Sequence, residues 1–176
     1  EGNESERTME LATVNSVFQA SLKNPMDAAI ARHASLDLSS YTKIDEIPFD
    51  FARRRMSVIV AKAGRRMLIT KGAPEGVLEA CTRLELGSDA ADAKDMTPRL
   101  RAAVLDEFER LSSDGYRAVA VAYRTIGNGR EIYSIADESN MTFVGYVSFV
   151  DPPKESTREA LEQAEALGVE IKILTG

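Results

Sequence analysis

The sequence predicts an α/β fold of the α+β kind, with a twisted, mainly antiparallel sheet flanked by helices. Runs at 55–61 and 116–126 are rich in β-branched and apolar residues, as strands are. Segments such as 7–22 and 97–115 instead repeat their apolar residues at helical spacing. The run 118–122 is wholly apolar, which is typical of a central strand covered on both faces. We therefore expect helices on both sides of the sheet.

The first half of the chain predicts two helices followed by three strands. A helix is expected over 7–22, and Asn24 with Pro25 is a good cap and first turn for a second helix. Strands follow at 44–49, 55–61 and 65–70. The last two flank a short loop that contains Gly64, which predicts a β-hairpin.

The second half predicts further helices and strands in alternation. In chain order these are a helix over 74–84, a small-residue acidic loop over 87–95, a helix over 97–115, strands at 116–126 and 141–150, a helix over 154–167 and a strand at 169–174. After Asp151-Pro152-Pro153, the spacing of the apolar residues changes to that of a separate helix and strand. We therefore divide the chain into one domain at 1–150 and a hinge with a fragment of a second domain at 151–176.

Composition excludes several classes of protein. The chain has 176 residues, of which 44% are apolar and 28% are charged, so an ordinary globular core is expected. The net charge of -6 argues against nucleic-acid binding through a diffuse positive field. No apolar run approaches the roughly 18 to 20 residues that span a bilayer. The single Cys81 forms no internal disulfide, which together with the absence of a secretory signal favours a reducing, cytosolic setting.

The segment Lys71-Gly72-Ala73-Pro74-Glu75 is a candidate ligand-binding turn. It places a lysine at the end of a strand, a glycine that permits a tight turn, and a proline at the first turn of a helix. We expect an exposed cation there, which a nucleotide could contact through its ribose or phosphates. A plain strand-to-helix turn explains the residues equally well. The segment is not a P-loop, because no Gly-Lys-Ser/Thr follows.

A second candidate lies where aromatic rings precede a run of cations. Phe49 and Phe51 come just before Arg53, Arg54 and Arg55. Adenine stacks on such rings, at roughly 1 to 3 kcal/mol per base. An aromatic residue before a strand more often belongs to the core. Charge pattern alone likewise favours a solvated basic run at the edge of a strand.

Two further charged residues are candidates with equally ordinary alternatives. The carboxylate of Asp27 could accept a hydrogen bond from the adenine amine, but acidic residues are common at helix starts in any case. Arg117 begins a buried strand and could reach a phosphate, or could pair with Asp114 or Glu107.

Taken in order, these segments resemble the nucleotide-binding (N) domain of P-type cation-transporting ATPases. The hallmark KGAPE stands at 71–75, the hinge motif DPP at 151–153, and the start of the TGD motif at 175–176. The stretch 43–58 and the Leu-Lys-Asn-Pro-Met-Asp segment at 22–27 are most similar to bacterial magnesium-transporting members.

The resemblance implies an ATP site whose residues have separate roles. By position these are Phe49 as the adenine-stacking ring, Lys71 as the pocket lysine, Arg54 as the basic residue on the opposite strand, Arg117 as the phosphate-contacting arginine, Asp27 where many relatives carry a glutamate, and Gly72 as a residue that shapes the pocket.

The resemblance also implies that the chain is one part of a larger enzyme. The phosphorylated aspartate and the aspartate completing TGD would lie outside 1–176, so only the intact pump is expected to hydrolyse ATP. No metal site is expected, because Mg²⁺ would arrive with the nucleotide. The expected partners are ATP and the phosphorylation and actuator domains of the same pump. The expected location is the cytoplasmic side of a bacterial inner (plasma) membrane protein, in a segment that does not touch the membrane.

Two rival functions stay open on the sequence. A free-standing phosphatase of the haloacid dehalogenase superfamily would explain the strand ending at Thr175, but its Asp-x-Asp motif is absent. A non-catalytic interaction module would use the basic cluster Arg53–Arg55 to bind an acidic partner.

Overall fold

The computed structural model describes residues 5–20, 24–33, 36–87, 92–150, 155–170 and 172, and these contain a seven-stranded sheet. In spatial order its strands are β1 (Tyr41–Asp50), β2 (Arg55–Lys62), β3 (Arg65–Gly72), β6 (Tyr116–Ile126), β7 (Met141–Val150), β4 (Cys81–Glu85) and β5 (Ala93–Asp95). The helices are α1 (Glu6–Phe18), α2 (Pro25–His33), α3 (Pro74–Glu79), α4 (Pro98–Ser113) and α5 (Glu155–Ala166). The predicted fold class is confirmed, and β6 is the central strand.

All neighbouring strands pair antiparallel except β4 and β7, which are parallel. The sequence prediction was wrong here, because it continued the helix from 74 to 84. The helix ends at Glu79, and Cys81 starts a strand that pairs with Met141 of β7. Alternation of apolar and polar residues is too short over five residues to be separated from the end of a helix. The partner strand β7 lies about 60 residues away in sequence, and pairing with it decides that residues 81–85 form a strand.

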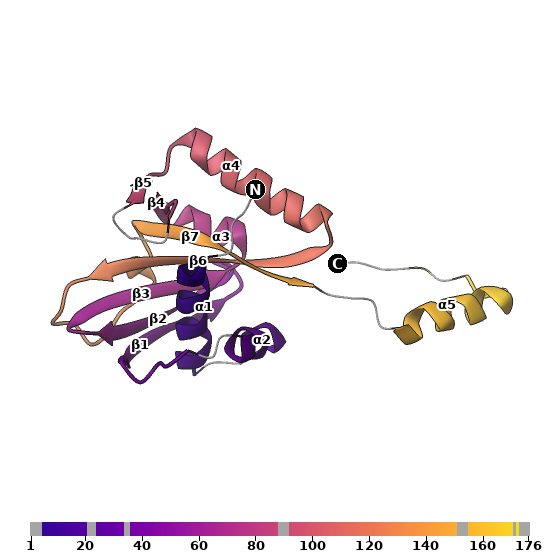
Figure 1. The fold of residues 1–176 in the computed structure, drawn as a ribbon, viewed down its shortest axis with the longest axis horizontal. Coiled ribbons are helices and arrows are strands. Elements are labelled where there is room, and N and C mark those ends of the chain that lie inside the picture. The colour runs from indigo at the N-terminus through magenta and orange to yellow at the C-terminus, as the bar shows by residue number, and fades with distance from the viewer. Residues whose placement is uncertain are drawn as a thin grey trace.

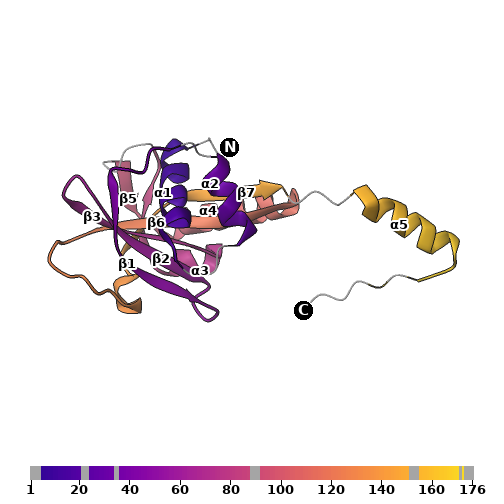
Figure 2. The same ribbon diagram turned by 90° about the horizontal axis from the view of Figure 1, so that it is seen from below.

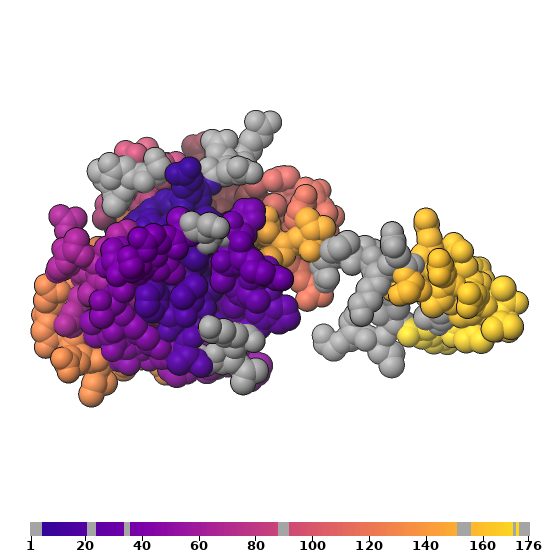
Figure 3. Space-filling model, turned by 60° about the horizontal axis from the view of Figure 1, so that its bottom comes forward, coloured from indigo at the N-terminus to yellow at the C-terminus, as the bar shows by residue number. Residues whose placement is uncertain are grey.

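One face of the sheet is covered by α1 and α2, the indigo and violet helices that Figure 3 turns toward the reader. Leu11 and Val14 of α1 and Ile30 of α2 pack on alternate residues of the central strands, among them Val58 and Val121. Ser5 caps α1 by accepting a hydrogen bond from the backbone N–H of Thr8. α1 is shorter than predicted, because the backbone turns extended at Gln19.

The other face is covered by α3 and α4, and Figure 1 shows α4 and α2 on opposite sides of the sheet. Val77 and Leu78 of α3 pack against Ile59 and Leu68 of the neighbouring strands. α4 starts as predicted, with Thr97 accepting a hydrogen bond from the N–H of Leu100 and proline at the first turn. Two apolar layers therefore hold the sheet from both sides.

The second predicted unit is described only in part. α5 forms where a helix was expected and lies apart from the sheet in Figures 1 and 2. Val169, Glu170 and Lys172 have no regular structure, and the remaining residues of the predicted strand at 169–174 lie outside the described residues. The motifs at 151–153 and 175–176 also lie outside them. The boundary between the two predicted domains therefore stays a prediction.

Cys81 is buried in the core, and we expect it to be unreactive while the domain is folded. Burial raises the pKa of its thiol to about 12, and nearby arginine charges only partly oppose this. Because the thiolate is the reactive form, an aromatic disulfide reagent at pH 8 should modify Cys81 only after unfolding in urea. Absorbance of the released thiolate measures the reaction. Rapid modification of the folded chain would show that the α3–β4 junction opens readily.

Candidate functional site

The topology gathers the predicted site residues at one end of the sheet. β1 ends at Asp50, β2 begins at Arg55, and β3 ends at Gly72, and these residues meet because the register pairs Asp50 with Arg55 and Arg55 with Gly72. The central strand β6 begins at the same end, since Gly72 pairs with Ala120. Segments that are up to 70 residues apart in the chain, from Asp50 to Ala120, therefore form one edge of the sheet.

Lys71 and Asp27 form a buried ion pair under α1 and α2. The Lys71 amine contacts the Asp27 carboxylate and donates a hydrogen bond to the hydroxyl of Ser16 at 2.5 Å. Lys71 is only 6% exposed, so the prediction of an exposed cation was wrong. Its position on β3 opposite Met56 turns its side chain toward the two helices, where the carboxylate compensates its charge.

Both oxygens of the Asp27 carboxylate are engaged by donors of the protein itself. One oxygen accepts from Lys71 and from Ser16, and the other accepts from the side chain of Gln19 and the backbone N–H of Asn24. Sequence reasoning missed Ser16 and Gln19, because helix periodicity marked that part of the chain only as a covering helix. The carboxylate therefore first serves to fix the lysine and to join α2 to α1.

The electrostatics of this pair favour the charged form of Asp27. Burial tends to raise the pKa of the carboxyl group, but the hydrogen bond and charge of Lys71 outweigh it, and the pKa lies below its usual range. Burial lowers the pKa of the Lys71 amine, and Asp27 opposes that effect. Burying Lys71 without Asp27, or Asp27 without Lys71, would be energetically unfavourable, because the charge that remained would have no counter-ion.

Phe49 lies at the rim of this sheet end and presents a ring to solvent. It is 47% exposed and stands edge-to-face against Phe51, which is 91% exposed, with ring centroids 5.4 Å apart. The alternative of a core aromatic is therefore wrong for this chain. The register of β1 shifts between Ile47 and Asp50, so Phe49 lies at an irregularity of the strand, next to the turn that leads to β2.

Arg54 stands at the tip of the turn between β1 and β2. Its backbone has a left-handed conformation, with φ of 51°, and is fixed by two backbone hydrogen bonds of 2.8–2.9 Å, from its N–H to Asp50 and from the N–H of Ala73 to its carbonyl oxygen. The guanidinium lies 3.8 Å from the carboxylate of Glu75, and both side chains are about half exposed. Arg54 thus keeps a cation in solvent beside the Lys71–Glu75 turn.

Two glycines permit this close contact between the turn and the start of α3. A Cβ atom at Gly72 would overlap the carbonyl oxygen of Arg54 and approach the Cα of Arg55 to 2.6 Å. A Cβ at Gly76 would overlap the carbonyl oxygen of Arg53. Gly72 was expected to shape the pocket, and this close backbone contact is a geometric reason for a glycine at that position. Gly76 was missed, although a second glycine inside a predicted helix was a signal of close backbone approach.

Arg53 and Arg55 do not form a solvated basic run. Their side chains are mostly buried, and both bind the carboxylate of Glu138, which the sequence analysis also missed. The interpretation as a solvated strand edge was wrong, because Arg55 lies on the interior strand β2, and both it and Arg53 of the preceding turn pair inside the protein. Only Arg54 of the three presents its charge to solvent.

Arg117 is exposed near the start of β6. Lys71 pairs with Val121, so alternation along the regular part of β6 places Arg117 on the same face as Lys71, about 13 Å further along the strand. The two acids proposed as its partners, Asp114 and Glu107, both hydrogen-bond to Arg110. Arg117 therefore lies on the face of the sheet that α1 and α2 cover, beyond the Lys71–Val121 pair.

A groove of about 730 Å³ lies elsewhere, and none of the six predicted site residues lines it. Its walls come from the start of α1, from the side of α4 that carries Leu100 and Val104, and from residues 143–148 of β7. At the predicted site, Phe49 and Arg54 are about half exposed, whereas Lys71 is buried.

These features agree with the comparison to known families. Residues 2–156 match the family described as P-type ATPase, cytoplasmic domain N. The chain belongs to this family. In this N domain, the sheet end described above combines an exposed aromatic ring, a buried lysine and the segment at 71–75.

The relatives of this N domain include magnesium- and calcium-transporting pumps. The chain is 39% identical to the "Magnesium-transporting ATPase, P-type 1" of Escherichia coli K12 and 40% identical to that of Salmonella typhimurium LT2, in both cases over 99% of this chain. It is 34% identical to the "Calcium-transporting ATPase" of Bacillus subtilis over 78% of this chain. The chain spans about a fifth of the length of the magnesium-transporting relatives and 15% of the calcium-transporting one. In the described part of the chain, no helix is long and apolar enough to cross a membrane.

Proposed function

We propose that this chain is the ATP-binding domain of a magnesium-transporting P-type pump and presents ATP to an aspartate of the phosphorylation domain. The observation that carries the proposal is the exposed ring of Phe49 at the sheet end that also carries Lys71 and Arg54. The magnesium specificity rests on the 39–40% identity to magnesium-transporting relatives over nearly the whole chain.

Each site residue has a task that its surroundings permit. The ring of Phe49 would stack on adenine, and Arg54 and Arg117 would attract the phosphates. Lys71, held by Asp27, would lie beneath the ligand as part of a fixed ion pair, with the Gly72 turn keeping the backbone close. One stacked base and a few partly exposed cations supply about 4 to 6 kcal/mol, which corresponds to roughly millimolar to tens of micromolar Kd.

The chemistry of the reaction belongs to the intact pump. Mg²⁺ enters as part of the Mg-ATP substrate, where it neutralises the charge on the β- and γ-phosphates. In this proposal residues 1–150 form the nucleotide-binding domain, and a hinge at 151–153 brings the bound ATP to the phosphorylation domain, to which 154–176 belong. The pump then lies in a bacterial inner membrane with this domain on the cytoplasmic side.

The test is an NMR titration of the chain with ATP, with and without Mg²⁺, repeated on Phe49→Ala. We expect shifts centred on Phe49, Lys71 and Arg117, and a rise in Kd of about tenfold or more in Phe49→Ala, because stacking on an aromatic ring contributes about 1–3 kcal/mol. Phe108→Ala is the matched control, since Phe108 is a partly buried aromatic on α4, on the other face.

Two outcomes would overturn the proposal. No shifts at millimolar ATP in the folded chain would exclude nucleotide binding and return attention to a binding module. Equal loss of affinity in Phe49→Ala and Phe108→Ala would locate the site elsewhere. The binding-module alternative is not favoured now, because Glu138 already neutralises two of the three clustered arginines.

A further inference from the structure

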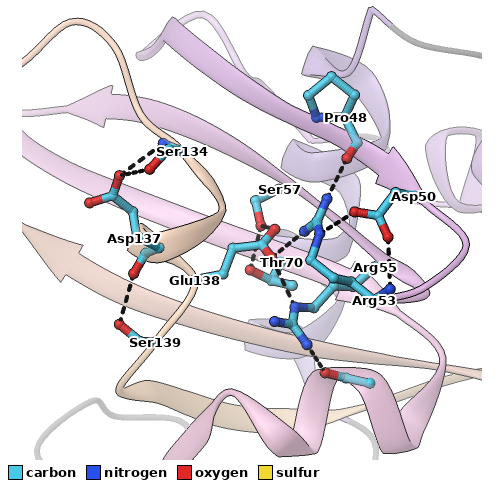
Figure 4. Close-up of polar contacts among 12 residues, drawn as sticks. Pro48, Asp50, Arg53, Arg55, Ser57, Thr70, Ser134, Asp137, Glu138 and Ser139 are labelled. Carbon is cyan, nitrogen blue, oxygen red and sulfur yellow. Dashed lines mark hydrogen bonds and ion pairs between the residues drawn. The ribbon is translucent and has the colours of Figure 1, made fainter.

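The side chain of Glu138 is completely buried, yet it belongs to no part of the proposed ATP site. It lies in the connection between β6 and β7, directly after the short helix η2 (Ile135–Asp137). Figure 4 shows its carboxylate at the centre of a polar cluster. One oxygen accepts from Arg53 and, at 2.9 Å, from Arg55, and the other accepts from Ser57 at 2.6 Å. The carboxylate thus accepts hydrogen bonds from three side chains and has no contact with solvent.

The cluster ties together the two segments that carry the ligand-facing groups. Arg53 lies in the turn after β1 and also binds the Asp50 side chain and, at 2.8 Å, the Pro48 carbonyl on either side of Phe49. Arg55 reaches the other way and donates to the carbonyl of Gly76 in α3. Glu138 therefore joins the end of β1, with Phe49, and the turn that carries Arg54 to the Lys71–Gly76 segment.

This cluster lies on the face of the sheet opposite to the Lys71–Asp27 pair. Ser57 is on the same side of β2 as Ile59, which packs in the core under α3 and α4. Lys71 faces α1 and α2 instead. Glu138 thus lies on the opposite face of the sheet from the Lys71–Asp27 pair. Because its side chain is completely buried, a nucleotide stacked on Phe49 would not contact it.

The loop gives Glu138 a defined position of its own. Asp137 accepts hydrogen bonds from the backbone N–H of Ser134 and from the guanidinium of Arg130, which closes η2 just before Glu138. Glu138 then supplies the charge that two nearly buried guanidinium groups require. Burial lowers the pKa of Arg53, but the hydrogen bonds that its guanidinium donates to Glu138 and Asp50 outweigh this effect and raise the pKa above its usual value.

We propose that Glu138 is a positioning residue for nucleotide binding, which holds the Phe49–Arg54 turn against the Lys71–Gly76 segment through Arg53 and Arg55. This inference rests on the proposed function. Without the carboxylate, the two guanidinium groups lose the counter-ion that they share and keep only their separate partners, Asp50 for Arg53 and Glu79 for Arg55. They then move apart, the turn leaves the glycines that it packs on, and Phe49 and Arg54 lose their fixed places at the sheet end.

The experiment compares Glu138→Gln with Glu85→Gln in the same chain. Glu85 is another buried glutamate, with Arg7 and Tyr123 as partners on α1 and β6, outside the Glu138 cluster. We expect Glu138→Gln to raise the ATP Kd about tenfold, whereas Glu85→Gln leaves the Kd within about twofold of the unmodified chain. The amide of Ala73, which donates to the Arg54 carbonyl across the junction, should exchange faster with solvent in Glu138→Gln only.

A milder variant covers the case in which Glu138→Gln does not fold. Ser57→Ala removes one of the three donors to Glu138 and is expected to raise the ATP Kd about two- to threefold, with the same change at Ala73. Unchanged ATP affinity and unchanged Ala73 exchange in the folded variants would overturn this inference while the proposed function stands. If the unmodified chain itself binds no ATP, the proposed function fails first.

Discussion

Replacing Asp27 by asparagine is expected to lower the free energy of unfolding by about 3–5 kcal/mol at pH 7. The asparagine keeps the shape of the side chain but leaves the Lys71 amine buried and without its counter-charge. The amide NH₂ of asparagine would also face Lys71, Ser16 or Gln19, which at present donate to the carboxylate. Urea unfolding followed by circular dichroism measures the difference.

The effect of Asp27→Asn should depend on pH in one direction. The pKa of Asp27 is lowered in the folded state, whereas an aspartate in an unfolded chain titrates near about 3.9. Its contribution to stability is therefore fully present above about pH 4 and is lost as the pH falls through the folded-state pKa. The difference between the unmodified chain and Asp27→Asn should shrink below pH 4.

Asp106→Asn on the exposed side of α4 is the control for the loss of a negative charge. It should change stability by less than about 0.5 kcal/mol. A stability of Asp27→Asn equal to that of Asp106→Asn at pH 7 would show that the Lys71–Asp27 pair contributes nothing to the fold.

Replacing Gly72 by alanine is expected to cost about 1–3 kcal/mol of stability, or more, and to weaken ATP binding in parallel. The added methyl group would overlap the backbone of Arg54 and Arg55, which cannot move aside as the end of a side chain can. The turn that carries Arg54 would have to separate from β3. Thermal unfolding and an ATP titration of the same sample measure both effects.

Gly127→Ala is the matched control for this substitution. Gly127 lies in the loop after β6, and a Cβ there meets nothing within 4 Å. Its backbone is not in the left-handed region, so alanine should be tolerated within about 0.5 kcal/mol. A Gly72→Ala variant as stable as Gly127→Ala would contradict the close packing of the turn on β3.

The fold was largely predictable because its main elements have strong local patterns. The strands at 55–61 and 116–126 appear as β2 and β6 almost residue for residue, since long β-branched and apolar runs have few alternatives. β4 was missed because five residues after a helix carry little periodic signal, and pairing with the distant β7 decides their conformation. The strand β5 was likewise predicted as loop, because three residues become a strand only through pairing with β4.

The sequence indicated candidate residues for the site, but it did not indicate how these residues are arranged. The KGAPE segment and the Phe49 region stand out in the sequence, and the register brings them to one sheet end. The burial of Lys71 was not predictable, because its partner Asp27 is 44 residues away on another element. The same holds for Arg53 and Arg55, whose counter-ion Glu138 follows them by more than 80 residues.

By itself, the sequence determined the fold class and the covering of the sheet on both faces, and it indicated candidate residues for an ATP site, because these depend on local periodicity and short motifs. Only the tertiary structure decided which charges are buried and which meet solvent. Arg54 stays exposed while Arg53 and Arg55 on either side are buried. The cost of burying a charge depends on a counter-ion brought from a distant part of the chain, and only the folded topology supplies it.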